Sequence, residues 1–433
     1  MLDLLTRLVD KSMVSISSEE PEVRYGLLET IREYAGQKLT EADEAEEVPA
    51  RHRDFFLGLA DDWAARANYW NWWLWIRQIS ADRDNFAAAL EWSSAKGDDD
   101  VLLRLAAAHW PYWYWGEALG WRHWLPEAIN RCDTPSPARV EALIALASLL
   151  IRAGEDATRC EALFQQARDE AVRLADDQVV AQVNFYQAHV LLSGGEVRKA
   201  EDLLLDSLGR SSNTDFIGWC HWGLGWIALL EDHLDEAATE FDTSLQLADQ
   251  ADDDSMRAHV HSALALVAAL RGDHETARTM AAEGVRSAER TVGAPRVLIM
   301  ALARAGQVAI LSGDDSAASP VLRLLRMLRD KGVTYWADEA LAVAALVLAD
   351  RLPEEAAVVL TSTASLREAL DDTGSQLGAM RGRMRRCRAQ LIETLGPGRW
   401  QEAEQEALAM PVGEAIVRAL AALETLSCGP NGG

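Results

Sequence analysis

Apolar residues follow a helical spacing along most of this chain, and from Arg139 to about Leu370 they form consecutive pairs of predicted helices. The second helix of each pair is rich in Ala and Leu, and it opens on a small residue a few positions after a short turn. These small residues are Cys160, Ala200, Ala237, Ala277, Ala318 and Ala356, at intervals of 40, 37, 40, 41 and 38 residues. Such a fixed period is typical of stacked units that each bury a face against the next. The pattern predicts an all-α, tetratricopeptide-like right-handed superhelical solenoid of about seven helix pairs, with the regular repeats at 135–372.

Glycines mark several of the predicted turns within the helix pairs. Four of these turns contain Gly154, Gly195, Gly272 or Gly313, and a left-handed backbone costs glycine the least. After the repeats, residues 373–426 predict further helices, which would form the polar-faced cap that a solenoid needs at its end. Residues 427–433 (SCGPNGG) predict a disordered tail.

The first 48 residues have a different pattern. LDLLTRLVDKSMV has helical spacing, VSIS and VRYGLL alternate on either side of an acidic turn, and ETIREYAGQKL is helical again. Helix, hairpin and helix make up the second half of a winged helix, so we expect a winged-helix remnant at 1–48 whose opening helices would lie before Met1. Residues 49–134 then predict an aromatic-rich helical adaptor and a first helix pair.

A stripe of tryptophans falls on the predicted concave groove of the solenoid. Leu224 and Gly225 stand 13 and 12 positions before Ala237, where a small pair lets two helices approach. The same register assigns to the groove Trp219, Trp222 and Trp226, together with Gln182, Phe185, His189, His259, Ser262 and Leu266 of the neighbouring units. Clustered, exposed tryptophans are typical of binding hot spots. The alternative is that the three indoles are buried between helix layers.

A second aromatic cluster lies in the predicted adaptor, where 11 of the 16 tryptophans fall between Trp63 and Trp124. One interpretation is a thick aromatic core that joins the winged-helix remnant to the repeats. The other is an exposed patch, with Trp70, Trp73, Trp110 and Trp113, that docks a partner or an ATPase domain.

Charge and cysteine usage narrow the choice of partners. The chain has 42 basic and 68 acidic residues and a net charge of −26, which disfavours direct binding to nucleic acid or to an anionic membrane surface. Its five scattered cysteines show no paired spacing and indicate a reduced, cytoplasmic protein. The most apolar stretch, VLIMALARAGQVAIL, is short and interrupted by Arg304, so we expect no membrane span.

Catalytic and metal-binding motifs are absent from the sequence. His259 and His261 are two positions apart, which points them in different directions on a helix, and neither HExxH nor GxSxG occurs. The arginine-rich run RGRMRRC (381–387) suits a helix that neutralises an acidic neighbouring repeat, or an anion-binding surface. We therefore expect a protein that is not an enzyme and that uses no metal or other cofactor.

Several segments resemble a known family. LVDKSMV, RYGLLETIREYAGQKL, RHRDFFLGLAD, DRDNFAAALEWS and LRLAAAHWPYWYW occur in the order found after the nucleotide-binding module of large bacterial STAND-type ATPase regulators of the LuxR-like and antibiotic-pathway activator types. The segment LGPGRWQEAEQEALAMPVGEAIVRALAALE is similar to the C-terminal end common in those proteins.

The resemblance implies a winged helix followed by tetratricopeptide-like repeats that sense a partner or inducer and restrain an ATPase switch. This chain has no GxxxxGK[ST] phosphate loop and no C-terminal helix-turn-helix, so ATP hydrolysis and DNA binding are not carried over. We expect a signal-sensing and protein-interaction module of a bacterial transcriptional regulator, whose partner is another protein or its own ATPase domain. The alternative is a receptor for an apolar or aromatic small-molecule inducer.

Overall fold

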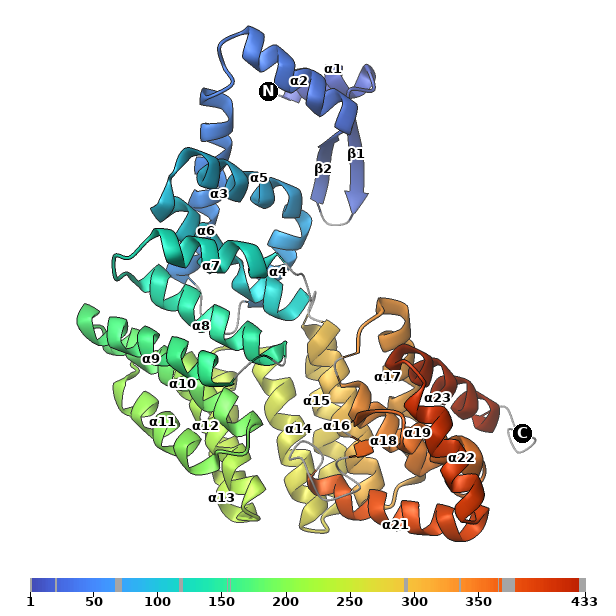
Figure 1. Cartoon of the computed structure of the whole chain (residues 1–433). Coiled ribbons are helices and arrows are strands. Elements are labelled where there is room, and N and C mark those ends of the chain that lie inside the picture. Colours follow the sequence, from blue (N-terminus) through green and yellow to red (C-terminus); the bar gives the residue numbers. More distant parts are fainter. Residues whose placement is uncertain are drawn as a thin grey trace.

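The computed structural model is a helical solenoid with a small β-hairpin near its N-terminus (Figure 1). The structure describes residues 2–19, 22–66, 72–116, 120–153, 155, 157–291, 295–334, 336–364, 366–367 and 378–427. The N-terminal elements form one end of the molecule (blue), the C-terminal helices form the other (red), and the helix pairs follow one another between them (Figure 1).

The N-terminal elements confirm the predicted order of helix, hairpin and helix. They are α1 (Leu2–Asp10), β1 (Val14–Glu19), β2 (Glu22–Leu27) and α2 (Glu29–Glu41). The two strands are antiparallel, with Ile16 opposite Tyr25. The hairpin is fastened to the next helices through Arg24, whose guanidinium donates to Asp82 at 3.0 Å and to the Ala81 carbonyl at 2.9 Å.

Three adaptor helices and seven consecutive helix pairs follow in the described part of the chain. The adaptor helices are α3 (Glu47–Arg66), α4 (Trp72–Ala81) and α5 (Arg83–Lys96). The pairs are α6 (Asp99–Gly116) with α7 (Trp121–Arg131), α8 (Pro137–Arg152) with α9 (Ala157–Leu174), α10 (Asp177–Ser193) with α11 (Val197–Arg210), α12 (Thr214–Leu230) with α13 (Leu234–Gln250), α14 (Asp254–Leu270) with α15 (His274–Arg290), α16 (Pro295–Ser312) with α17 (Ala318–Lys331), and α18 (Ala337–Leu348) with α19 (Pro353–Leu360).

The predicted repeat register is visible in the packing of each pair. Ala200, Ala237 and Ala277 are fully buried. Ser207 and Ser244 stand seven residues after Ala200 and Ala237. Their hydroxyls donate to the carbonyls of Ala181 and Gly218 at 2.9 and 2.8 Å, and these hydrogen bonds join the two helices of each pair. At Gly225 a Cβ atom would lie 2.6 Å from the Phe241 ring, so only glycine allows this approach.

In the sixth pair the register is shifted by one residue from the prediction. Ala317, and not Ala318, is buried at the packing position. The cause is a short 3₁₀ turn, η2 (Asp315–Ala317), which precedes α17 and changes the rotation at which that helix starts. The predicted turns at Gly195, Gly272 and Gly313 have the expected left-handed backbone, with φ of 81°, 80° and 65°. Gly154 lies outside the described residues.

The two helices of each pair belong to different layers. From α8 to α18 the first helices of successive pairs contact one another, whereas the second helices make few or no such contacts in the described part of the chain. A solenoid curves toward the layer whose members are closer together, so the first helices form its inner layer. Helix α16 is long and apolar enough to cross a membrane by length and composition, and 56% of it is buried inside the solenoid.

An ion pair recurs in the pairs and fastens the start of one helix to the end of its partner. It joins Asp99 to Arg131, Asp177 to Arg210 and Asp254 to Arg290, with N···O distances of 2.8, 2.8 and 2.7 Å. The acid lies in the first turn of the first helix and the arginine in the last turn of the second, where each also favours the helix dipole.

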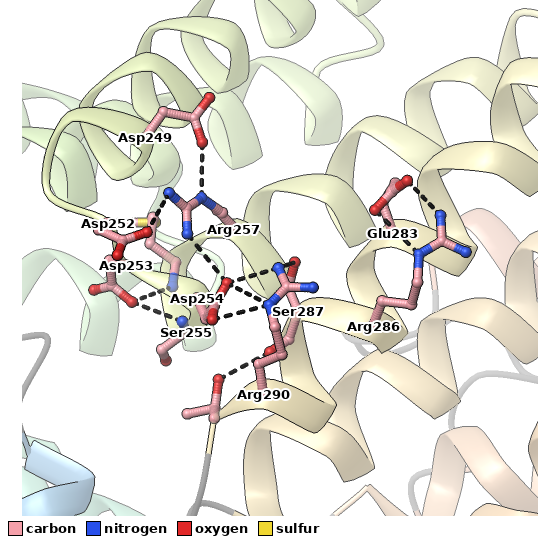
Figure 2. A network of polar contacts seen from close by, with 12 residues as sticks. Asp249, Asp252, Asp253, Asp254, Ser255, Arg257, Glu283, Arg286, Ser287 and Arg290 are labelled. Atoms are coloured by element: carbon pink, nitrogen blue, oxygen red, sulfur yellow. Dashed lines mark hydrogen bonds and ion pairs between the residues drawn. The ribbon is translucent and has the colours of Figure 1, made fainter.

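At the third of these ion pairs the network widens to the preceding repeat. Figure 2 shows Arg257 between Asp249, Asp252 and Asp254, at 2.7, 3.0 and 3.1 Å, while Asp254 also binds Arg290. The network therefore joins the end of α13 and the turn after it to both helices of the next pair.

The last helices close the end of the solenoid. They are α21 (Gly378–Leu395), α22 (Pro397–Leu408) and α23 (Val412–Ser427), and α23 packs on α17 and α18. Trp400, Leu391 and Leu420 belong to the same hydrophobic core as α18 and α19. The predicted tail from Cys428 onward lies outside the described residues.

Candidate functional site

The three predicted groove tryptophans lie on α12 in the inner layer, and they differ in exposure. Trp219 is buried, with 5% of its surface exposed, whereas Trp222 and Trp226 are partly exposed. Neighbouring rings touch edge to face, with centroid distances of 5.3 Å between Trp219 and Trp222 and 5.9 Å between Trp222 and Trp226. Trp219 therefore acts as the buried base of the stripe, and the other two present surface.

Histidines from the adjacent repeats extend this stripe on both sides. His189 of α10 stacks on Trp222, and His259 of α14 lies against Trp219 at 5.0 Å and Trp222 at 6.0 Å. We call these five residues, His189, Trp219, Trp222, Trp226 and His259, the aromatic row. The row crosses three successive first helices, so side chains that are far apart in the sequence form one continuous surface.

Both histidines of the row are held in one tautomer. The Nδ1 atoms of His189 and His259 lie 2.9 and 2.8 Å from the carbonyls of Phe185 and Ser255, and a carbonyl can only accept, so Nδ1 carries the proton. Burial lowers the pKa of His189, and burial aided by the nearby Arg296 and Arg304 lowers the pKa of His259 to about 4. Both rings are neutral at pH 7, which makes each Nε2 a hydrogen-bond acceptor.

The other four predicted groove residues, Gln182, Phe185, Ser262 and Leu266, have different positions, and Leu266 is buried with 2% of its surface exposed. Phe185 is fully buried, because its ring packs against Phe216 at 4.7 Å. Ser262 is 2% exposed, and its hydroxyl donates to the Ala258 carbonyl of its own helix at 2.7 Å. The prediction that Phe185, Ser262 and Leu266 line an open groove is therefore wrong, because all three are buried. Gln182 is exposed, as a groove residue would be.

An arginine that the sequence prediction did not include continues the row. Arg304 of α16 lies between two indoles, 4.8 Å from the ring centre of Trp226 and 4.8 Å from that of Trp336 at the start of α18. Its one hydrogen bond within the described structure runs from Nη1 to Gln307 Oε1 at 2.7 Å. Arg304 interrupts the most apolar stretch of the chain. A single charged residue in an otherwise apolar helix was the sequence signal that could have identified it as a site residue.

Two buried indole N–H groups and a buried carboxyl also belong to this part of the inner layer. The indole N–H groups of Trp222 and Trp226 are buried and have no acceptor among the described residues. Glu339 of α18 is 8% exposed, and burial raises the pKa of its carboxyl against the attraction of Arg304. Trp336 has φ of 64°, a left-handed backbone that costs a bulky residue on the order of 1–3 kcal/mol.

The second predicted cluster is largely core. Trp110 and Trp113 are 2% and 4% exposed, so the prediction of an exposed docking patch is wrong for these two. The reason is the packing of α6 on α8 and on the adaptor helices, where Trp75 and Trp63 stack at 5.3 Å. Trp70 and the side chain of Trp73 lie outside what the structure describes.

Trp110 also holds a carboxyl in this cluster. Its indole N–H donates to Glu141 of α8 at 3.1 Å, and its ring touches Tyr186 of α10 at 5.3 Å. Burial raises the pKa of Glu141 to about 7. The described residues contain no group of three His, Cys, Asp or Glu side chains arranged to hold a metal ion. Burial raises the pKa of the Cys220 and Cys387 thiols to about 12, which leaves both in the unreactive thiol form.

Comparisons with known proteins connect part of the chain to transcriptional regulators. No family model matches the chain. A protein of Mycobacterium bovis and two of Mycobacterium tuberculosis, each named as an HTH-type transcriptional regulator, are 36% identical to it over 149 residues. The aligned segment covers 33% of this chain and 17% of each relative, so the match spans only a small part of these larger proteins.

Solved structures with the same architecture come from repeat proteins. A Rap protein complexed with Competence and Sporulation Factor matches 82% of this chain and 97% of its own, with a TM-score of 0.55 and 14% identity. A STAND protein with a tetratricopeptide repeat sensor from Pyrococcus horikoshii matches 93% of this chain and 57% of its own, with a TM-score of 0.51 and 13% identity. At this identity the likeness shows the fold, a tetratricopeptide-type solenoid, which confirms the predicted class.

Proposed function

We propose that this chain is the signal-sensing and partner-binding repeat module of a bacterial STAND-type transcriptional regulator, that it acts in the cytoplasm and that it catalyses no reaction. The observation that carries the proposal is the aromatic row, where partly exposed rings and desolvated polar groups from successive repeats share the inner layer. Large aromatic rings supply much contact area at a low cost in conformational entropy, as binding hot spots require.

The comparisons support the regulatory setting. Proteins 36% identical over a third of the chain bear the name of transcriptional regulators. Two proteins share the architecture: a STAND protein with a tetratricopeptide repeat sensor, and a Rap protein complexed with Competence and Sporulation Factor. The partner in this proposal is another protein or the regulator's own ATPase domain.

A small-molecule inducer is the second candidate. It is favoured by the buried N–H groups of Trp222 and Trp226, which have no acceptor among the described residues, because a small ligand with an acceptor atom could satisfy them.

The test uses the full chain and the double variant Trp222→Leu, Trp226→Leu. A soluble extract of a bacterium that carries a related regulator is divided into a macromolecular fraction and a small-molecule filtrate, and each is added while the melting temperature and tryptophan emission are recorded. We expect one fraction to raise the melting temperature of the natural chain and to leave the double variant unchanged. The active fraction distinguishes a protein partner from an inducer.

The matched control is Leu205→Ala, which removes an exposed apolar side chain from α11 in the outer layer. This variant should respond like the natural chain. A response that persists in the Trp222, Trp226 double variant would exclude the aromatic row as the binding surface.

A further inference from the structure

Arg304 is a partly buried cation that has no ion-pair partner among the described residues. No carboxylate of the described residues lies within 4.0 Å of its guanidinium, and only one of its five N–H groups has an acceptor, Gln307. Desolvation lowers the pKa of Arg304, although the side chain keeps partial contact with solvent. Arginine nevertheless stays charged at neutral pH. Buried charges in proteins are ordinarily paired, so this one calls for an anion from elsewhere.

The nearest internal candidate does not fill this role. Glu339 lies close enough to interact with Arg304, but beyond ion-pair distance, and burial raises the pKa of its carboxyl. Glu339 therefore attracts Arg304 without occupying its N–H groups, and Arg296 and Arg304 both act on His259, within a chain whose net charge is −26. A local positive site in an acidic protein attracts anions selectively.

The two indoles that flank Arg304 define the rest of the ligand. Trp226 and Trp336 hold the guanidinium between them by cation–π contacts, and its remaining N–H groups can meet a carboxylate in the two-pronged geometry that arginine prefers. One guanidinium balances one negative charge, which suits a carboxylate better than a doubly charged phosphate. The partly exposed faces of Trp222 and Trp226 offer contact to an apolar or aromatic group next to it.

We propose that Arg304, held between Trp226 and Trp336, is an anion subsite that binds the carboxylate of a ligand whose neighbouring group is apolar or aromatic. This inference rests on the proposed function, because it names the ligand chemistry of the same surface. The carboxylate belongs either to the C-terminal residue of a peptide or to a small aromatic acid.

The test compares acids with their uncharged amides. The peptide pair is acetyl-Ala-Ala-Phe with a free or amidated C-terminus, and the small-molecule pair is 3-phenylpropionate and 3-phenylpropanamide. Each is titrated into the full chain and followed by tryptophan emission. We expect at least one acid to bind at least tenfold more tightly than its amide. The pair with the larger difference identifies the source of the carboxylate.

Variants separate the charge from the fold. Arg304→Met keeps an apolar stem between the indoles and should abolish the preference for the acid, whereas Arg304→Lys should retain part of it with weaker binding. Arg286→Met, on α15 of the outer layer, is the control and should behave like the natural chain. Thermal melting checks that each variant is folded.

The outcomes distinguish this inference from the proposed function. Equal binding of acid and amide, an acid preference that survives Arg304→Met, or no binding of either acid would overturn the anion subsite. None of these results contradicts the proposed function. Its own test is the response to the extract fractions, and a response that persists in the Trp222, Trp226 double variant would exclude the aromatic row as the binding surface.

Discussion

The imidazole of His189 and the indole of Trp222 lie parallel, with ring planes 4° apart and centroids 5.9 Å apart. The two residues come from successive repeats, and their stack spans the boundary between α10 and α12. The stack depends on the relative position of the two repeats. A ligand that binds against these rings would therefore also affect how the two repeats pack against each other.

The tryptophans of α12 should differ in their contribution to stability. Trp219→Ala removes a buried ring and should cost about 3–5 kcal/mol, enough to unfold the surrounding repeats. Trp222→Ala removes a ring that is already partly in solvent and should cost roughly 1–2 kcal/mol. Urea unfolding followed by circular dichroism measures both. An unchanged midpoint for Trp219→Ala would show that the Trp219 ring does not belong to the core. Trp222→Phe, which keeps an aromatic ring at position 222, is the control for loss of the aromatic stack.

Glu141 should make the protein less stable as the pH rises. Its pKa is about 7 in the folded chain and 4.5 in the reference state, so in this window the unfolded chain loses its proton first. Unfolding is therefore favoured increasingly from about pH 4.5 to 7, by at most about 3 kcal/mol in total. Glu141→Gln keeps the acceptor for Trp110 and cannot ionise, so it should stabilise the chain at pH 8 and change little at pH 4.5.

Denaturant midpoints across this pH range measure the Glu141 effect. Glu161→Gln, at an exposed position of α9, is the matched control and should follow the natural chain at every pH. A parallel pH profile for Glu141→Gln and the natural chain would show that Glu141 titrates normally.

The recurring ion pair should contribute measurable coupling at Asp254 and Arg290. The Asp254 side chain is 27% exposed and also binds Arg257, so a double-mutant cycle with Asp254→Ala and Arg290→Ala should give about 0.5–1 kcal/mol. The control cycle uses Glu283 and Arg286, an exposed pair within one turn of α15, and should give a smaller value. Equal coupling in the two cycles would mean that the Asp254–Arg290 pair contributes no more than an ordinary surface pair.

The N-terminal elements should exchange their amide protons fastest. Val14 is the only buried side chain among those described in residues 3–41, and α2 buries none. Local opening there exposes little apolar surface, so α2 should lose protection well before residues 254–348 in hydrogen exchange. Slow exchange in α2 would contradict this prediction and would show that a partner covers the helix in solution. The variant Arg24→Met releases the hairpin from Asp82, so it should accelerate exchange only in β1 and β2.

The repeat fold was predictable because each unit meets the same packing requirement. Ala200, Ala237 and Ala277 are small for one reason, the close approach of two helices, and that reason recurs at a fixed period. The prediction fails by one residue at Ala318 because the 3₁₀ turn before α17 is a local event that the period does not encode.

The site was less predictable because exposure depends on neighbours that the periodic pattern does not specify. Phe185 and Trp222 were assigned to the groove by the same register, yet Phe185 is closed off by Phe216 from the following repeat. The contact between Arg304 and Trp336 joins two repeats through the curvature of the solenoid, which no spacing within one repeat determines. Conversely, the tryptophan stripe was found because its three members lie on one helix.

The ion pair between the first turn of one helix and the last turn of its partner also bears on how such a chain can lengthen. Because Asp177 and Arg210 close a pair with residues of that pair alone, a duplicated DNA segment encoding α10 and α11 would carry its own fastening with it. The new copy would need to match its neighbours only in the small residues and apolar faces that all units share. Repeat number can then change by recombination without a second, compensating mutation, while the rings and charges of the inner layer remain free to diverge toward new ligands.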